Sequence, residues 1–293
     1  MFPGAVMQPS VKAFFDQATY TFSYVVRDPD STHCAIIDSV LDYDPKSGRT
    51  STHSADAIVD YIEAQGLKVD WILETHAHAD HITGSVHLLE RLGGRTGIGA
   101  RIVDVQATFM KLFNLTGDLV PNGRQFDHLF EDGDRFAIGT MSVDVIHTPG
   151  HTPACLTYLI GDCAFVGDTL FMPDYGTARA DFPGGDARTL YRSIRRVLSL
   201  PSATRLFLCH DYLPEGRSEY FHETSVAAER EGNIHVHDGI SEDSFVAMRN
   251  ARDKTLEMPT LILPSIQVNI RAGHFPEPES NRVVYLKIPV NAV

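Results

Sequence analysis

The chain is organised around the stretch Thr75-His76-Ala77-His78-Ala79-Asp80-His81-Ile82-Thr83-Gly84. Three histidines and one aspartate fall within six consecutive positions, between an apolar run at 69–73 and a segment at 84–92 that has the pattern of a helix. A chain that leaves a strand through a short loop can aim the imidazoles at positions i and i+2 at one point. The next carboxylate and imidazole can then face a neighbouring point. The stretch therefore predicts a metal site at the end of a strand.

The residue types in this motif narrow the choice of metal. Imidazole and carboxylate ligands together suit zinc, iron or manganese, and a set of nitrogen and oxygen donors without thiolate argues against a structural, cysteine-type zinc site. The alternative is a polar, histidine-rich loop that packs against solvent. The rest of the chain argues against this alternative, because further candidate ligands follow at later strand ends.

Three more candidate ligands follow predicted strands. His151 lies in a loop fixed by two prolines and a glycine, after a strand over 141–145 in which apolar and polar residues alternate. Asp168 comes directly after an apolar strand and a glycine, although a turn is the commoner role of a Gly-Asp pair in isolation. His210 follows the strand 205–209. A strand that ends in a candidate ligand thus occurs four times.

Composition excludes several classes of function. The chain has 293 residues, of which 43% are hydrophobic and 22% charged, values that are ordinary for a globular protein. The formal net charge of −13 argues against a general binder of nucleic acid or of anionic membranes, since such surfaces need clustered cations. An acidic ligand must therefore meet a local basic pocket.

The sequence shows no recognisable export or transit signal. Residues 1–9 have neither a cationic region followed by an apolar stretch nor an Arg-rich amphipathic pattern, and no apolar run approaches the ~18 residues of a spanning helix. The cysteines form no C-x-x-C pair, which favours buried free thiols in a reducing compartment. We therefore expect a cytoplasmic protein with unpaired thiols at Cys34, Cys155, Cys163 and Cys209.

The remaining pattern predicts one domain over 1–293, with an insertion at about 105–130 and a C-terminal extension from about 223. The insertion either packs in the core, which we favour, or forms a lid over the substrate. The arginines on the outer face of the helix 187–200 are expected to be solvated. Paired strands are expected over 11–38, an edge strand over 282–288, and helices over 54–66 with Ser54 as N-cap, 84–92, 105–113, 187–200, 223–231 and 241–252 with Ser241 at its start.

The ligand pattern resembles the metallo-β-lactamase superfamily. It combines His76-x-His78-x-Asp80-His81 with His151, Asp168 and His210, each at a strand end. The resemblance implies an α/β (α+β) fold, an αβ/βα sandwich of two mixed β-sheets flanked by helices. Within the superfamily, the segments 75–84, 148–153, 166–170, 179–182 and 210–212 are similar to the persulfide dioxygenases, over roughly residues 10–275.

This second resemblance implies a reaction and a ligand set. Persulfide dioxygenases oxidise glutathione persulfide with O2 to sulfite and glutathione at one non-haem iron(II) per chain, which here implies the ligands His76, His151 and Asp168. Two imidazoles and one carboxylate form a facial triad with positions left for substrate and O2. The remaining motif residues would then orient the ligands and bound water by hydrogen bonds; they are His78, Asp80, His81 and His210.

The identity of the ligand residues is also compatible with a second enzymatic activity. All seven positions needed for a di-metal hydrolase are present, so the alternative is a glyoxalase II-like di-metal hydroxyacylglutathione thioesterase, with Asp168 bridging the metals. Against it, Arg179-Ala180-Asp181-Phe182 resembles the dioxygenases, and the C-terminal region looks short of a basic, tyrosine-containing substrate region. A third alternative, a non-catalytic sulfur or metal sensor, does not explain why every ligand is retained.

Glutathione carries two carboxylates, so its pocket should present arginines, whose fork geometry matches a carboxylate. The candidates for substrate contacts are Tyr175, Arg179, Tyr212, Arg217 and Arg271. For each of them, an ordinary surface arginine or a packed tyrosine remains the alternative. A homodimer is compatible with the sequence, as it is with most enzymes of this size.

Overall fold

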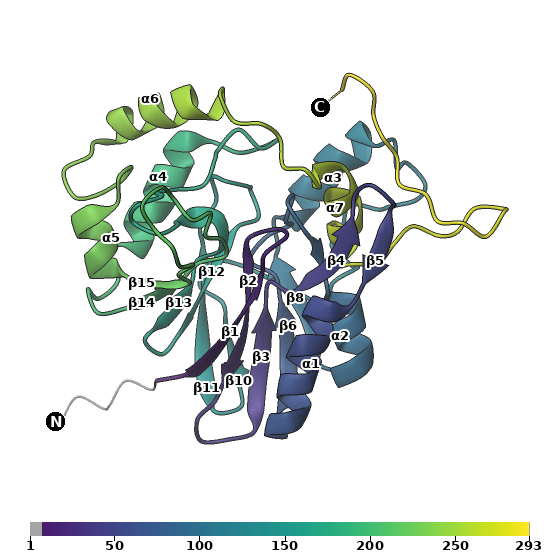
Figure 1. Cartoon of the computed structure of the whole chain (residues 1–293), viewed down its shortest axis with the longest axis horizontal. Helices are drawn as coiled ribbons and strands as arrows, with labels where there is room; N and C mark the ends of the chain where they lie inside the picture. Colours follow the sequence, from purple (N-terminus) through teal and green to yellow (C-terminus); the bar gives the residue numbers. More distant parts are fainter. Residues whose placement is uncertain (1–7, 293) are drawn as a thin grey trace.

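The computed structural model describes residues 8–292, and two six-stranded sheets dominate it (Figure 1). One sheet has the order β1-β2-β3-β6-β8-β9, and the other has the order β10-β11-β12-β13-β14-β15. Each sheet combines antiparallel and parallel pairs: β3, β6, β8 and β9 run parallel in the first, and β13 and β14 in the second. Most of the N-terminal segment in which no export signal was found lies outside the described residues.

The strands and helices have the following bounds. The strands are β1 (Ser10–Asp16), β2 (Thr21–Arg27), β3 (His33–Ile37), β4 (Val40–Asp44), β5 (Arg49–Ser51), β6 (Lys68–Leu73), β7 (Ile82–Thr83), β8 (Arg95–Gly99), β9 (His128–Phe130), β10 (Arg135–Ile138), β11 (Met141–His147), β12 (Leu156–Ile160), β13 (Cys163–Phe165), β14 (Arg205–Phe207) and β15 (Glu223–Ser225). The helices are α1 (His53–Gln65), α2 (Ser85–Leu92), α3 (Ile102–Leu112), the 3-10 turn η1 (Gly167–Thr169), α4 (Ala187–Val197), α5 (Val226–Gly232), α6 (Glu242–Asp253) and α7 (Ile262–Asn269).

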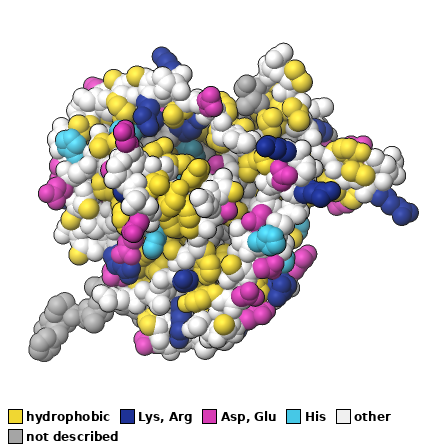
Figure 2. All heavy atoms as spheres, in the orientation of Figure 1, with side chains coloured by type: hydrophobic (Ala, Val, Ile, Leu, Met, Phe, Trp, Pro, Cys, Tyr) yellow, Lys and Arg dark blue, Asp and Glu magenta, His cyan; other side chains and the backbone are white. Residues whose placement is uncertain are grey.

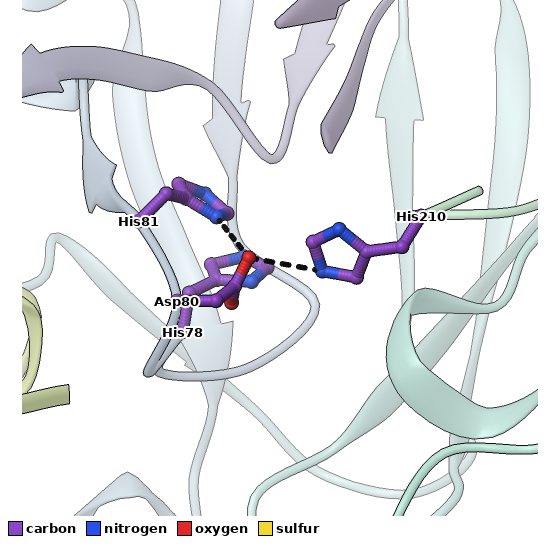
Figure 3. Close-up of side chains that lie close together, drawn as sticks. All are labelled: His78, Asp80, His81 and His210. Atoms are coloured by element: carbon purple, nitrogen blue, oxygen red, sulfur yellow. Dashed lines mark hydrogen bonds and ion pairs between the residues drawn. The ribbon is translucent and has the colours of Figure 1, made fainter. Parts of the chain in front are cut away.

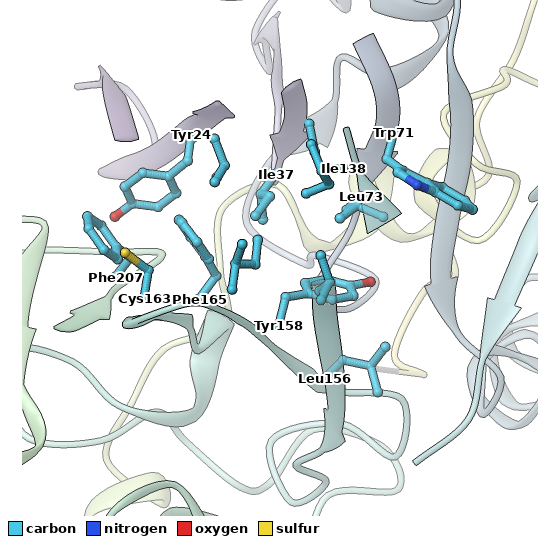
Figure 4. Close-up of a cluster of buried hydrophobic side chains, with 14 of the residues drawn as sticks. Tyr24, Ile37, Trp71, Leu73, Ile138, Leu156, Tyr158, Cys163, Phe165 and Phe207 are labelled. Atoms are coloured by element: carbon cyan, nitrogen blue, oxygen red, sulfur yellow. The ribbon is translucent and has the colours of Figure 1, made fainter. Parts of the chain in front are cut away.

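The sheets pack face to face, and helices cover their outer faces. Between the sheets, Tyr24 and Trp71 of the first sheet share a buried cluster with Tyr158 and Phe165 of the second (Figure 4). Helices α1 and α2 pack on the outside of the first sheet, and α4 and α6 on the outside of the second. Because both faces of each sheet are covered, a central strand such as β2 is buried along nearly its whole length. The predicted αβ/βα sandwich of two mixed sheets is confirmed.

Two helix starts test the predicted caps. The helix α1 buries the predicted positions Ala55, Ile58, Val59 and Ile62, but it begins at His53 with Thr52 as N-cap, so the predicted Ser54 cap is wrong. The hydroxyl of Ser54 instead donates to Asp42 on β4 at 2.7 Å. The predicted cap of α6 is confirmed, because the Ser241 hydroxyl accepts from the Ser244 N–H.

The region 105–130 packs in the core. Side chains of α3 and the following loop, including Phe109, Phe113 and Phe126, share a buried cluster with Ile266 and Ile270 at α7. None of the described residues of this region lines the cavity presented below. Core packing, which we favoured over a lid, is therefore what the structure shows. Among residues 8–292, no helix has the length and apolar character needed to cross a membrane.

The outer arginines of α4 do more than face solvent. Arg188 and Arg192 both pair with Glu242 at the start of α6, at 2.5 and 3.1 Å. Arg195 pairs with Asp238 just before α6, and Arg196 with Asp132. The predicted solvated face is thus wrong in part. Each exposed pair contributes at most about 1 kcal/mol, but the pairs with Glu242 and Asp238 together hold α6 and the loop before it against α4.

The predicted edge strand over 282–288 does not form. This segment runs extended along the side of β4 and β5, and most of its side chains are exposed (Figure 1). Its main chain bonds to a side chain instead of a strand: the N–H and the C=O of Lys287 pair with the Gln267 amide at 2.9 Å each. The β-type pattern of this segment therefore formed no strand.

A buried carboxyl group on α5 makes the stability of the fold depend on pH. Glu229 is fully buried, and one of its two carboxyl oxygens has no hydrogen-bond partner among the described residues. Burial raises the pKa of Glu229 from 4.5 to about 8. In the unfolded chain this carboxyl group loses its proton near pH 4.5, but in the folded chain it does so only near pH 8. The stabilisation of the folded state is therefore complete below pH 4.5 and is lost as the pH rises to about 8.

We expect the Glu229→Gln variant, which cannot ionise, to lose this pH dependence. Urea unfolding should show a variant that is more stable than the wild type at pH 8 by at least about 2 kcal/mol, with the difference shrinking toward pH ~5, since one pKa unit corresponds to about 1.4 kcal/mol. The matched control is Glu231→Gln, which changes an exposed carboxylate on the same helix. Parallel curves for wild type and Glu229→Gln would show that the carboxyl group is not buried as described.

Candidate metal centre

Three of the predicted ligands meet where the strands end. His76 follows β6, His151 follows β11, and Asp168 lies in η1 directly after β13. The Oδ2 atom of Asp168 is 3.6 Å from His151 Nε2 and 3.9 Å from His76 Nε2, and all three side chains are buried. Gly167 allows this approach: its φ is +51°, and a Cβ there would lie 2.4 Å from Thr75 Oγ1.

The other four motif residues form a second group beside the first (Figure 3). Asp80 Oδ2 is 3.3 Å from His81 Nδ1 and 3.3 Å from His210 Nε2. His210 Nε2 is also 3.3 Å from Asp168 Oδ1. His78 completes the group, and the candidate ligand atoms all lie within 4.8 Å of one another. Asp168 therefore lies between the two groups and can reach either.

Unpartnered buried atoms show that the residues fit a metal ion. In the described part of the chain, five buried atoms of these two groups have no hydrogen-bond partner: His76 Nε2, His78 Nδ1, His81 Nε2, His210 Nε2 and Asp168 Oδ1. Leaving a buried polar atom unpaired costs about 1–3 kcal/mol, so such a cluster is rare in a folded protein. A cation bound by imidazole nitrogens and carboxylate oxygens would satisfy them.

Hydrogen bonds fix which ring nitrogen is free. Nδ1 of His151 donates to the main-chain oxygen of Arg179 at 2.8 Å, and Nδ1 of His210 donates to that of Tyr20 at 3.2 Å. Because a carbonyl can only accept, each Nδ1 carries a proton, and Nε2 is the ring nitrogen left to bind a metal. Burial, with the neighbouring imidazoles of His78 and His151, holds the pKa of His76 well below its usual range. A neutral imidazole is the form that binds metal.

Two polar residues that hold the motif were missed in the sequence. Asp38, which directly follows β3, accepts the Thr75 N–H at 2.7 Å and lies 3.0 Å from His78 Nε2. Asn269 on α7 donates to the carbonyl oxygens of His78 and His81 at 2.8 and 2.7 Å. The signal for Asp38 was present, since it is another carboxylate at a strand end. No local signal marks Asn269.

A cavity of about 430 Å³ opens onto the first group. His151, Asp168 and Asp80 line it, as do the predicted Tyr175, Arg179 and Tyr212. Figure 2 shows a hollow near the centre of this face, with apolar side chains at its margin and Lys or Arg side chains above it. The other lining residues are mainly apolar and aromatic, including Tyr20, Tyr43, Ala79, Phe171, Leu256 and Leu261.

Two predicted substrate arginines lie away from this cavity. Arg217 is not among its lining residues and pairs with Asp211 and with Asp174. Arg271 is buried at the end of α7 and does not line the cavity either. Arg179 does line it, but its guanidinium is engaged by Asp181 at 2.6 Å.

The helix α6 brings two other arginines to the cavity, which corrects the impression that the C-terminal region lacks a basic part. Arg249 and Arg252 both line the cavity. Arg249 is buried and pairs with Asp253 at 2.6 Å. Arg252 is exposed, and within residues 8–292 no carboxylate pairs with it. Neither residue was found in the sequence, since a helical arginine gives no local sign of the cavity that it faces.

The cysteines are free and buried, as predicted. Burial raises the pKa of Cys34 and of Cys155 to about 12, so both remain thiols at neutral pH. Cys209 lies beside His210 among the candidate ligands, and burial raises its pKa as well.

Comparisons with known proteins agree with this geometry. Residues 17–210 match the model of the family described as the metallo-beta-lactamase superfamily. The chain is 57% identical to a probable metallo-hydrolase of Burkholderia pseudomallei, over 97% of this chain and 100% of that protein. It is 47% identical to glyoxylase B2 of Dictyostelium discoideum, over 96% of this chain and 97% of that protein.

Persulfide dioxygenases also match, at lower identity. The mitochondrial persulfide dioxygenase ETHE1 of Homo sapiens is 29% identical over 90% of this chain and 88% of that protein. A crystal structure of ETHE1 from Myxococcus xanthus superimposes with a TM-score of 0.71 and 29% identity, over 90% of this chain and all of that chain. With its fold, its ligand motifs and the family match over 17–210, the chain belongs to the metallo-β-lactamase superfamily and is related to the persulfide dioxygenases.

Proposed function

We propose that the chain is a glutathione-dependent persulfide dioxygenase with one iron(II), held by His76, His151 and Asp168. Each turnover would take one glutathione persulfide, one O2 and one water, and give one glutathione and one sulfite. The terminal sulfur loses four electrons and O2 gains them, so no further reductant is needed. The similarity to ETHE1 proteins supports the reaction class.

One observation carries this proposal: the cavity opens mainly onto the triad. His151 and Asp168 of the triad line the cavity, whereas of the second group only Asp80 does. A substrate in the cavity would therefore meet a metal held by the two imidazoles and one carboxylate of the triad on the side of His151 and Asp168. This facial triad is the donor set of non-haem iron oxygenases, in which iron supplies redox chemistry at positions that the protein leaves open.

The residues around the triad have separate tasks. The Arg179 carbonyl holds the His151 ring in the tautomer that presents Nε2. Phe171 and Leu261 give the cavity apolar walls that limit access of water to the reactive persulfide. Burial raises the pKa of Tyr212 well above its ordinary value, so its hydroxyl stays protonated and can donate to the substrate. Asp80 can orient a water beside Asp168.

A carboxylate of the glutathione portion should bind Arg252, the exposed cavity arginine without an acidic partner in the described structure. We expect Arg252→Gln to raise KM for glutathione persulfide about tenfold, because a charge-assisted pair contributes about 1.5–3 kcal/mol, and to leave kcat within about twofold. The control is Arg192→Gln on the outer face of α4. An unchanged KM in Arg252→Gln would remove this residue from the substrate site.

The reaction is tested by product analysis on iron-loaded protein. We expect sulfite to form from glutathione persulfide in step with O2 uptake, and no release of lactate from S-lactoylglutathione. Lactate release without O2 uptake would replace the dioxygenase by the second candidate, a glyoxalase II-like di-metal thioesterase. The complete second group of ligands and the similarity to glyoxylase B2 are the observations that favour this second candidate.

A further inference from the structure

Hydrogen bonds from the C-terminal extension hold the loop 176–181, which follows η1 and borders the cavity. The Asn233 amide donates to the Gly176 carbonyl at 3.0 Å, and His235 Nδ1 accepts the Thr177 N–H at 3.1 Å. Burial, with the nearby arginines of α6, lowers the pKa of His235 to about 4, so its Nδ1 is an acceptor at neutral pH. The conformation of the loop is thus set by residues more than fifty positions away.

An ion pair on α6 makes further hydrogen bonds to the same loop. Asp253 Oδ2 accepts the Ala180 N–H at 2.9 Å, while Asp253 Oδ1 accepts from Nε of Arg249 at 2.8 Å. The same guanidinium donates from Nη1 to the Thr177 carbonyl at 3.0 Å. Arg249 is 1% exposed and Asp253 is 5% exposed. All three guanidinium nitrogens of Arg249 are therefore engaged by the protein, although the residue borders the cavity.

One peptide unit links the ion pair to the triad. The carbonyl that accepts from His151 Nδ1 belongs to Arg179, and the N–H held by Asp253 belongs to Ala180, so both groups are parts of the same planar peptide. Fixing the N–H in direction fixes the opposite C=O, and through it the imidazole ring. A ligand histidine depends in this way on the group that accepts from its second nitrogen.

We propose that the Arg249–Asp253 pair positions His151 for metal binding and so sets the affinity of the triad for its ion. A buried ion pair is weak evidence for stability, because desolvation offsets most of its attraction. Because the pair binds the 179–180 peptide, its role is to fix the direction of the Arg179 carbonyl group. The inference concerns the imidazole alone and holds whichever metal and reaction the site has, so it stands or falls separately from the proposed function.

The test compares metal affinity in matched variants. The double variant Arg249→Met with Asp253→Leu removes both charges, so no unpaired charge stays buried, and it removes the acceptor for the Ala180 N–H. We expect its affinity for Co(II), measured by competition with a chelator, to fall about tenfold or more, the usual cost of losing a partner of a ligand histidine. The visible spectrum of bound Co(II) should change as well, because it reports the ligand geometry.

Two further variants separate positioning from other roles. Arg249→Met with Asp253→Asn keeps an acceptor for the Ala180 N–H. We therefore expect this variant to bind Co(II) with an affinity within about threefold of the wild type, against the loss of about tenfold or more in the Leu variant. Arg252→Gln, on the next turn of the same helix, should leave Co(II) affinity unchanged. If the Leu variant does not fold, Arg249→Met with Asp253→Ala, which also lacks an acceptor for the Ala180 N–H, carries the test. A folded variant without an acceptor for the Ala180 N–H that binds Co(II) like the wild type, or that changes only KM, would overturn the proposal.

Discussion

Replacing Asp168 by alanine should abolish metal binding and O2 uptake together. The carboxylate is the only anionic member of the triad, with Oδ2 at 3.6 Å from His151 Nε2, and its loss leaves two neutral imidazoles. A bound metal supplies several kcal/mol of the lowering of the barrier, so we expect a loss of activity on the order of a thousandfold. Elemental analysis of anaerobically purified protein and an O2 electrode measure the two effects.

The matched variant is Asp80→Ala, which removes a carboxylate from the second group. A single-iron centre predicts that this variant keeps its iron and loses activity by about tenfold at most, since Asp80 would only orient neighbouring groups. A di-metal hydrolase predicts losses of similar size for Asp80→Ala and Asp168→Ala. Equal losses in the two variants would therefore contradict a single-iron centre.

The second large effect is expected at Gly150, next to the proposed ligand His151. Its φ is +137°, and a Cβ there would lie 2.3 Å from both the N and the Cα of Leu190 in α4. Backbone atoms of a packed helix cannot move aside as a flexible side chain does. We expect Gly150→Ala to lower the free energy of unfolding by about 3 kcal/mol or more, the sum of backbone strain and overpacking.

The control for Gly150 is Gly117→Ala. Gly117 also has a positive φ, +93°, but a Cβ there would meet nothing within 4 Å. Its substitution should cost only backbone strain, about 1 kcal/mol. Urea unfolding of the metal-free proteins measures both variants. Similar stabilities of the two variants would show that the loop before His151 does not pack on α4 as described.

The fold and the meeting of the three candidate ligands were predictable because each of them follows a strand. Sandwich topology brings those strand ends to one edge, so His76, His151 and Asp168 meet although they are far apart in the sequence. Asp38 fits the same rule but needs one more fact, that β3 lies beside β6 in parallel with Ile37 opposite Leu73. That register belongs to the sheet, and no local pattern encodes it.

Substrate contacts were less predictable, because an arginine gives no sequence sign of what it faces. Arg217 follows the ligand strand closely, yet Asp211 lies six positions earlier and holds it. Arg252 lies on a helix, as the arginines of α4 do, and only the packing of α6 turns it toward the cavity. The missed cap of α1 has a similar cause, since Asp42 on β4 captures Ser54.

The number of metal ions needed for activity tests the proposed chemistry most directly. Metal-free protein is titrated anaerobically with Fe(II), and each sample is then given glutathione persulfide and O2. We expect O2 uptake to saturate at about one iron per chain, as a facial triad requires, with one O2 consumed for each sulfite formed. Absence of O2 uptake at any iron content, together with hydrolysis of S-lactoylglutathione that saturates at two metals per chain, would contradict it.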